Sequence, residues 1–139
     1  MVIGVRTPRQ MLEDFATIAV VGASRHEEKA AYAVPLQLKL HGWRVIPVNP
    51  YADEIWGERC YPSLAEVPEP VDLVNVFRPS GQAADVVRQA VAIGAKAVWL
   101  QQGIVSPEGR RFAVDAGLDY VEDLCIAVER ALDRLTKRF

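Results

Sequence analysis

The sequence IAVVGASRHEEK, residues Ile18 to Lys29, begins as an apolar run and ends in a charged loop. Its first residues are apolar on both faces, which is typical of a strand that helices cover on each side. Gly22 stands where the chain would leave this strand, and glycine allows both a sharp turn and a close approach of the backbone to a ligand. The stretch therefore predicts a β-strand and a tight turn that leads toward a helix, whose free N–H groups favour anions.

Apolar runs and helical patterns alternate along the rest of the chain. After the strand at 18–22, further strands are expected at 44–48, 73–77, 97–101 and 120–122. Helices are expected from residue 8 and over 32–41, 81–93, 107–116 and 124–137, with a short turn at 64–67. Five βα units with short connections predict a parallel sheet with right-handed crossovers.

The expected architecture is α/β: a Rossmann-like three-layer fold, formed by residues 1–139 as a single domain. Its five parallel strands, numbered in chain order, should lie in the order 3-2-1-4-5. In such a sheet the ligand lies beyond the carboxyl ends of the strands, at the point where the winding reverses. We therefore expect the binding site near strands 1 and 4.

Residues with capping side chains stand before most of the expected helices. Thr7, Pro8 and Gln10 predict a capping box, and Ser63 with Glu66 predicts another. The later helices have one candidate cap each: Ser80, Ser106 and Asp123. Glycines that follow periodic segments mark three helix ends: Gly42, Gly94 and Gly117.

Composition and charge argue against several classes of protein. Half of the residues are hydrophobic and the net charge is −2, so no basic face points to nucleic acid as the partner. No segment reaches the roughly 20 apolar residues of a membrane span, and the N-terminus has no long apolar run. Cys60 and Cys125 match no metal or redox spacing, which favours packed, reduced thiols. We therefore expect a cytoplasmic protein with no metal site and no nucleic-acid or membrane partner.

The loop after the first strand offers groups that suit a phosphate. Ala23 and Ser24 provide main-chain amides, and the Ser24 hydroxyl adds another donor. Arg25 and Lys29 bring positive charge. The alternative is that Gly22 only forms the turn while the two cations are solvated, as charged loop residues usually are. Both interpretations stay open on these residues alone.

A nicotinamide dinucleotide fits this sequence less well. Its G-x-G-x-x-G fingerprint would need glycines where Ser24 and Glu27 stand. An acidic residue is also expected at the end of the second strand to bind the ribose hydroxyls, whereas this sequence has Asn49 and Pro50 there. An NAD(P)-binding protein is therefore a minor alternative.

Several segments of the chain, taken in order, resemble the CoA-binding domain family. They are VVGASR with a following lysine, VIPVNPYADEIWGERCYPSL, VDLVNVFRP, AVWLQQGI and a late Cys-Ile pair. The chain is similar to the small stand-alone bacterial branch of this family and to the CoA-binding domain of the succinyl-CoA synthetase alpha subunit. The resemblance runs from about Thr7 to Leu135, and it implies a Rossmann-like domain that holds coenzyme A across the strand ends.

Position by position, the resemblance implies a set of cofactor-binding residues. They are Gly22, Ala23, Ser24 and Arg25 in the phosphate-binding turn, Lys29 in the loop after it, Asn49, Pro50 and Tyr51 after strand 2, Phe77, Arg78 and Pro79 after strand 3, and Gln102, Gly103 and Ile104 after strand 4. In the synthetase the third of these segments lies along the adenosine and the fourth beneath the pantetheine arm. The diphosphate and the 3′-phosphate of CoA need cations, which Arg25, Lys29 and Arg78 would supply.

The resemblance does not extend to catalysis. The synthetase carries its phosphorylated histidine in a second domain, and we expect no counterpart of that domain here. His26 and His41 lack the neighbouring carboxylate and nucleophile of a triad; His26 is expected in a solvated loop and His41 at a helix end. We therefore expect a protein that binds CoA or an acyl-CoA without catalytic machinery of its own, and so not an enzyme. The alternative is a regulatory or scaffold subunit that completes a CoA-dependent enzyme, and either role is compatible with a homo-oligomer or a protein partner.

The sequence also allows predictions about the burial of three further side chains. Trp56 lies in the glycine-flanked loop 53–61 and is expected to be exposed at a subunit contact, whereas Trp99 is expected in the core. Cys125 stands at the start of the last helix. A buried structural thiol is its expected role, and disulfide exchange with the CoA thiol is the alternative.

Overall fold

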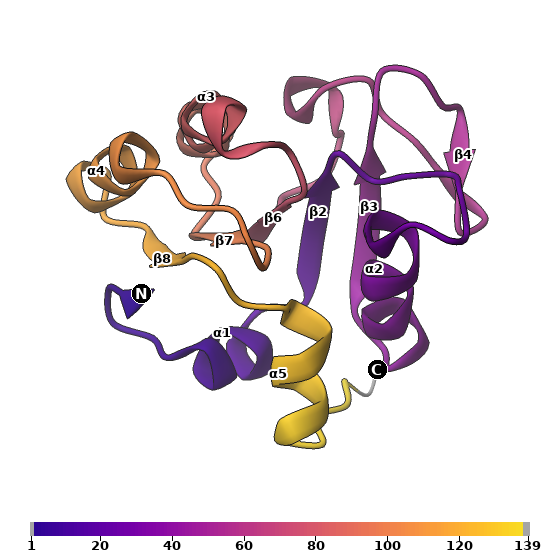
Figure 1. Ribbon diagram of the computed structural model, residues 1–139, viewed down its shortest axis with the longest axis horizontal. Helices are drawn as coiled ribbons and strands as arrows, with labels where there is room; N and C mark the ends of the chain where they lie inside the picture. Colours follow the sequence, from indigo (N-terminus) through magenta and orange to yellow (C-terminus); the bar gives the residue numbers. More distant parts are fainter. Residues whose placement is uncertain (1, 138–139) are drawn as a thin grey trace.

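Residues 2–137 are described by a computed structural model, in which helices cover both faces of a central sheet (Figure 1). The main sheet has six strands in the spatial order β1-β8-β7-β6-β2-β3. Their bounds are Val2–Ile3 (β1), Thr17–Val21 (β2), Arg44–Val48 (β3), Leu73–Val76 (β6), Ala97–Leu100 (β7) and Asp119–Val121 (β8). β2, β3, β6, β7 and β8 are parallel, and β1 runs antiparallel to β8 at one edge.

The strand order differs from the expected one. In the chain-order numbering of the five parallel strands it is 2-1-3-4-5, not 3-2-1-4-5, because β6 pairs directly with β2, with Ile18 opposite Leu73. The sheet also has a sixth strand, the short β1, which the sequence patterns did not indicate. The fold class itself is confirmed as α/β with a mostly parallel central sheet.

Pro47 gives a physical reason for β3 to lie at the edge of the sheet. The N–H and C=O groups of one strand residue point to the same side, and the Pro47 carbonyl points outward, where it accepts a hydrogen bond from Tyr61 N at 3.0 Å. The Pro47 nitrogen, which carries no hydrogen, therefore also faces the outer edge. An internal β3, as the expected order required, would have lost a ladder hydrogen bond at this residue.

Helices pack against both faces of the sheet (Figure 1). On one face lie α1 (Pro8–Asp14), α2 (Ala30–Leu40) and α5 (Ile126–Leu132); on the other lie α3 (Ser80–Ala92) and α4 (Pro107–Asp115), with a short 3-10 turn, η1 (Leu64–Glu66), before β6. Trp99 belongs to the hydrophobic cluster beneath the first group, and Leu100 to the cluster beneath the second. The expected core position of Trp99 is thus confirmed. No helix within residues 2–137 has the length and apolar character needed to cross a membrane.

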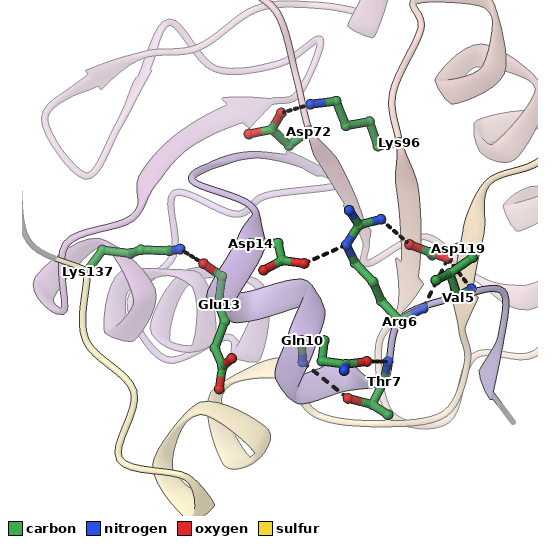
Figure 2. Close-up of polar contacts among 10 residues, drawn as sticks. All are labelled: Val5, Arg6, Thr7, Gln10, Glu13, Asp14, Asp72, Lys96, Asp119 and Lys137. Carbon is green, nitrogen blue, oxygen red and sulfur yellow. Dashed lines mark hydrogen bonds and ion pairs between the residues drawn. The ribbon is translucent and has the colours of Figure 1, made fainter.

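Two of the expected helix caps are confirmed. Thr7 Oγ1 accepts a hydrogen bond from Gln10 N at 3.2 Å, and Thr7 N donates to Gln10 Oε1 at 2.9 Å, which completes the capping box of α1 (Figure 2). Ser106 Oγ accepts from Gly109 N at 2.9 Å at the start of α4. The glycines expected at helix ends all have positive φ angles: Gly42, Gly94 and Gly117.

Three other expected caps are wrong. Ser80 is already the first residue of α3, and its Oγ accepts a hydrogen bond from Val105 N at 3.1 Å. Asp123 does not cap α5, because its Oδ1 accepts from Gly103 N at 2.6 Å. Ser63 is the N-cap residue of η1, but its Oγ accepts no main-chain hydrogen bond and instead donates to Glu66 Oε2 at 3.4 Å, so the capping box is not formed. Ser80 and Asp123 instead hold the turn that follows β7, so that tertiary contacts have replaced local ones.

The last helix is shorter than expected. α5 ends at Leu132 instead of continuing to residue 137, and Arg134 beyond it has a φ of 51°. The chain then turns so that Lys137 N donates to His41 O at 2.8 Å. A Cβ at Gly42 would collide with the Lys137 carbonyl oxygen, so glycine is required where the two segments cross.

The segment after β3 forms a hairpin that the sequence patterns did not indicate. β4 (Glu54–Ile55) pairs antiparallel with β5 (Glu58–Arg59) through a two-residue turn of Trp56 and Gly57, both with positive φ. The expected exposure of Trp56 is wrong: 8% of its surface is accessible, and its Nε1 donates to Tyr32 O at 2.9 Å. The indole therefore fastens the hairpin to α2.

Ion pairs hold the segments at the amino ends of the strands (Figure 2). Asp119 is 4% exposed; it accepts a hydrogen bond from Val5 N at 2.8 Å and pairs with the Arg6 guanidinium at 3.1 Å. Asp72 pairs with Lys96 Nζ at 3.3 Å. These contacts tie the segment after β1 to β8, and the start of β6 to that of β7.

Candidate functional site

The winding of the sheet reverses between β2 and β6. The chain leaves β2 toward α2 on one face and leaves β6 toward α3 on the other face (Figure 1). Connections that diverge in this way leave a crevice beyond the carboxyl ends of the two strands, where ligands bind in open α/β sheets. The crevice expected near strands 1 and 4 therefore lies between strands 1 and 3, because β6 stands between β2 and β7.

A cavity of about 500 Å³ opens at this crevice. Its wall includes Gly22 after β2, the segment 49–51 after β3, a turn before η1, and residues along α3. α3 contributes Gln82, Asp85 and Gln89, whose spacing places them on one face of the helix. The volume is that of a small-molecule site rather than of a packing defect.

Gly22 brings the ends of β2 and β6 into close contact. It has a φ of 89°, and its N–H donates to Val48 O at 3.0 Å. A Cβ on Gly22 would lie 2.9 Å from Arg78 Cδ and 3.2 Å from the main chain of Phe77. Any other residue would therefore be strained and would also push against the segment after β6. Arg78 crosses the turn in contact with the glycine.

The two residues after this glycine are fixed by contacts within the protein. Ala23 is fully buried, and its carbonyl accepts a hydrogen bond from Asn49 Nδ2 at 2.7 Å. Ser24 N donates to Ala31 O at 3.2 Å, and Ser24 Oγ accepts from His26 N at 3.0 Å. The Ser24 amide, which we expected to serve a ligand, is therefore already paired. These residues set the shape of the turn.

Three exposed cations lie on the segments after β2 and β6: Arg25, Lys29 and Arg78. None of the three pairs with a carboxylate within residues 2–137. Arg78 Nε donates instead to Gln82 Oε1 at 3.0 Å, a neutral partner. Lys29 stands directly before α2, whose first turn has no acidic residue. Within the described part of the chain these three cations are therefore free of ion pairs, and the exposed Glu27 and Glu28 in the same loop are free of them as well.

Asp85 brings one negative charge to the cavity wall. Gln89 Nε2 donates to its carboxylate at 2.9 Å, and Arg88 Nη1 lies 3.7 Å from it on the same helix. Its charge is therefore partly compensated within α3.

Tyr51 presents an aromatic ring at the rim of the cavity. The residue is 86% exposed, although tyrosine usually buries much of its ring. Its N–H donates to Asn49 Oδ1 at 2.7 Å, which fixes the turn after β3. An exposed ring next to a cavity suits stacking on a flat group of a ligand.

The structure brings together only part of the predicted site. The cavity wall contains Gly22, Asn49, Pro50, Tyr51 and Arg78. The other predicted residues do not line it: Ala23, Ser24, Arg25, Lys29, Phe77, Pro79, Gln102, Gly103 and Ile104. Phe77 packs against the hydrophobic core, and the turn 102–104 follows β7, one strand farther along the sheet.

Sequence analysis missed the wall that α3 supplies. Gln82, Asp85 and Gln89 of α3 line the cavity but were not among the predicted residues, and neither was Ser63 before η1. The polar residues of α3 recur three and four places apart, which marks one face of a helix. That signal was present, but the expected strand order put strand 3 at the edge of the sheet and α3 away from the crevice.

The cysteines and histidines lie apart from one another. Cys60 is buried, burial raises the pKa of its thiol, and its Sγ donates to Asn49 O at 3.4 Å. Cys125 is half-buried at the N-cap of α5. His26 is exposed and His41 caps the end of α2, both as expected. Across the described part of the chain, no three His, Cys, Asp or Glu side chains gather as a metal site.

The fold and the site together define a doubly wound α/β domain with a crevice at the switch between β2 and β6. The chain belongs to the CoA binding domain family, whose family model matches residues 16–131. The resemblance seen in the sequence segments is thereby confirmed.

Individual relatives agree with this family. The uncharacterized protein YneT of Bacillus subtilis (strain 168) is 35% identical over 126 residues, which are 91% of this chain and 93% of YneT. The ADP-forming acetate–CoA ligase II of Archaeoglobus fulgidus is 32% identical over 99 residues, which are 70% of this chain but 15% of the ligase. A hypothetical protein from Pyrococcus horikoshii OT3 has a solved structure with a TM-score of 0.87 and 36% identity, covering 90% of this chain and 88% of that one.

Proposed function

We propose that the protein binds coenzyme A, free or as an acyl-CoA, in the crevice beyond β2, β3 and β6. The observation that carries this proposal is the cavity of about 500 Å³ at the switch point. Arg78 lies in its wall, and Arg25 and Lys29 follow in the loop after Gly22; none of these cations has a carboxylate partner among the described residues. Membership of the CoA binding domain family supports this choice of ligand.

The phosphates of CoA would lie along the turn after β2. CoA carries a diphosphate and a 3′-phosphate, and a guanidinium group binds phosphate through two parallel hydrogen bonds. Arg78, which donates to the neutral Gln82 amide, can turn toward a phosphate without breaking an ion pair. Arg25 and Lys29 precede α2 and add charge near the amino end of a helix, where anions are favoured.

The adenine would enter the cavity itself. Tyr51 at the rim is placed to stack on a base. Gln89 and Ser63 offer neutral donors and acceptors in the wall, which suit the edge of a base better than a phosphate. The pantetheine arm would then run toward the end of β7 and the turn 102–104.

We infer that this chain binds the cofactor without a reaction of its own. Its match to the ADP-forming acetate–CoA ligase II covers 15% of that enzyme, so the activity of the ligase is not carried over here. A subunit that presents CoA to a partner enzyme is the second candidate, and the same relationship favours it. Purification from the native host distinguishes the two, because a partner enzyme would accompany the protein at a fixed ratio.

Thermal unfolding with and without ligands tests CoA binding. CoA at a hundred times its dissociation constant should stabilise the folded protein by about 2.7 kcal/mol. Dephospho-CoA should stabilise it less, because a charged contact to the 3′-phosphate is lost, and NADH should leave the melting temperature unchanged. Identical melting curves in saturating CoA and in buffer would contradict the proposal.

A charge reversal locates the phosphate site. Arg25→Glu should abolish the stabilisation by CoA and leave the stability of the free protein unchanged, because Arg25 is exposed. The matched control is Arg111→Glu on α4, an exposed position outside the cavity wall, which should keep the wild-type response. Equal CoA affinities of the Arg25→Glu variant and the wild type would move the phosphates away from this loop.

A further inference from the structure

Asn49 joins three segments around the cavity through both its main chain and its side chain. Asn49 N donates to Tyr61 O at 2.9 Å, and Asn49 O accepts a hydrogen bond from Cys60 Sγ at 3.4 Å. The side chain reaches further: Nδ2 donates to Ala23 O at 2.7 Å, and Oδ1 accepts from Tyr51 N at 2.7 Å. One carboxamide therefore links the turn after β2 to the aromatic rim of the cavity.

The peptide bond between Ala23 and Ser24 is held on both sides. In a trans peptide the C=O and N–H groups point in opposite directions. The Ala23 carbonyl faces Asn49 after β3, and Ser24 N–H faces the Ala31 carbonyl in the first turn of α2. A reversed peptide would point its oxygen at that second carbonyl, near the helix end that favours an anion. The orientation of the Ala23–Ser24 peptide therefore affects the electrostatic potential at the turn after β2, where the phosphates are proposed to bind.

We propose that Asn49 is a positioning residue of the CoA site: its carboxamide holds the Ala23 carbonyl away from the phosphates and holds Tyr51 at the rim. This inference rests on the proposed function. It differs from the contact that the family resemblance implied for Asn49, because the residue acts through its two neighbours. Loss of the Nδ2 donor would leave the carbonyl of a fully buried residue unpaired, which is unfavourable and promotes rearrangement of the turn.

An aspartate at this position gives a test that depends on pH. In Asn49→Asp the introduced carboxylate keeps an acceptor for Tyr51 N but loses the donor to Ala23 O. The ordinary pKa of Asp is about 3.9; the facing Ala23 carbonyl raises the pKa of the introduced carboxyl group by favouring its protonated form, whereas the Tyr51 N–H favours the charged form. On acidification the carboxyl group gains an O–H that can donate to Ala23 O. CoA affinity relative to wild type should fall about tenfold near pH 8 and rise again as the pH is lowered and the introduced carboxyl group becomes protonated.

Measurements on the wild type at each pH provide the reference for the charged and ionisable groups that remain in the variant. Those near Asn49 are Cys60, Tyr51, Arg78 and, in the loop after β2, His26. The phosphates of CoA titrate as well, and the ratio of variant to wild-type affinity removes their contribution. Wild-type binding of CoA is the first arm of the experiment, so a failure of the proposed function is seen separately from a failure of this inference.

Asn49→Ala separates the hydrogen bond from the charge. It should bind CoA about tenfold more weakly than wild type at every pH, because it has neither the donor nor a carboxylate. The introduced carboxylate could also weaken binding by repelling the phosphates. If that repulsion were the whole effect, protonation at low pH would remove it, and the CoA affinity of Asn49→Asp would then equal that of Asn49→Ala. Recovery beyond the alanine variant supports the positioning role, and recovery that stops at its level overturns it.

Amide hydrogen exchange in the free protein distinguishes positioning from direct contact. In Asn49→Ala the amides of Ser24 and Tyr51 should exchange faster than in wild type without any ligand, whereas the amide of Val98 in β7 should stay protected. Unchanged exchange at Ser24 and Tyr51 together with weakened CoA binding would show that Asn49 contacts the ligand itself, and would overturn the inference.

Discussion

At the amino ends of the strands Arg6 pairs with Asp119 and Lys96 pairs with Asp72 (Figure 2), whereas at the carboxyl ends Arg78 lies against a neutral amide. The first region contains a nearly buried carboxylate with its partners in place, and the second contains a cavity with Arg78, which pairs with no carboxylate of the described residues, in its wall. One end of the sheet is therefore closed by its own charges, and the other leaves charge available for a ligand. In open α/β sheets the carboxyl ends are where such a ligand binds.

The largest expected effect comes from a change at the open end. Gly22→Ala places a Cβ 2.9 Å from Arg78 Cδ at a φ of 89°. We expect the affinity for CoA to fall by about a hundredfold or more and the free energy of unfolding to fall by about 1–3 kcal/mol. Isothermal titration calorimetry and urea unfolding measure the two quantities.

Gly94→Ala is the matched control for this change. Gly94 also has a positive φ, of 78°, but a Cβ there meets nothing within 4 Å, and the residue does not line the cavity. This variant should lose stability through backbone strain and keep wild-type affinity for CoA. A comparable loss of CoA affinity in both variants would show that strain alone, rather than the geometry of the turn, weakens binding.

A change at the amino ends of the strands should lower the stability of the protein without lowering its affinity for CoA. Asp119→Ala removes the acceptor of Val5 N and the partner of Arg6. We expect the free energy of unfolding to fall by about 2 kcal/mol, because a nearly buried group that serves main-chain donors is lost. CoA affinity at 25 °C should be unchanged. An altered affinity would contradict this expectation and would mean that the two ends of the sheet are coupled.

The smallest effect is expected at Glu58, which accepts a hydrogen bond from Arg44 and pairs with Lys39 Nζ at 3.2 Å. Burial raises the pKa of Glu58, but the hydrogen bonds from Arg44 and Lys39 outweigh it, so that the pKa lies below its ordinary value. A lowered carboxyl pKa stabilises the fold above the pKa of the unfolded chain, and this stabilisation is lost as the pH falls through the folded pKa.

Glu58→Gln should therefore reduce the free energy of unfolding at pH 7 by less than about 1 kcal/mol, because the pair is partly solvated. The difference from wild type should vanish in acid, and urea unfolding across the range from pH 7 to pH 3 measures it. A difference that persists at the acid end would assign the effect to packing rather than to charge.

Alternation of apolar and helical segments was sufficient to predict the α/β class and the positions of the five parallel strands to within a few residues. This alternation was not sufficient to predict the strand order, because periodicity describes the two faces of a strand and does not indicate which strands lie next to it. Pro47 did carry that information, since a proline whose nitrogen faces a neighbouring strand would cost a ladder bond. β1 was missed because a pair of residues is too short to show a period.

The candidate site was predictable where it depends on strand ends and less so where it depends on packing. Gly22, Asn49 and Arg78 follow strands directly, so the general rule for α/β sheets found them. The polar face of α3 required the correct strand order. The caps assigned to Ser80 and Asp123 failed for a related reason, because their partners lie 25 and 20 residues away in the sequence and no local pattern contains them.

The missing hydrogen at Pro47 has a consequence for how copies of this protein behave beside one another. A free sheet edge is a template on which another chain can add a strand and begin a fibre. A strand added along β3 would face the Pro47 nitrogen, which has no hydrogen to donate. The Pro47 carbonyl already accepts a hydrogen bond from Tyr61 N. The residue that favours an edge position for β3 therefore also disfavours the addition of a further strand at that edge.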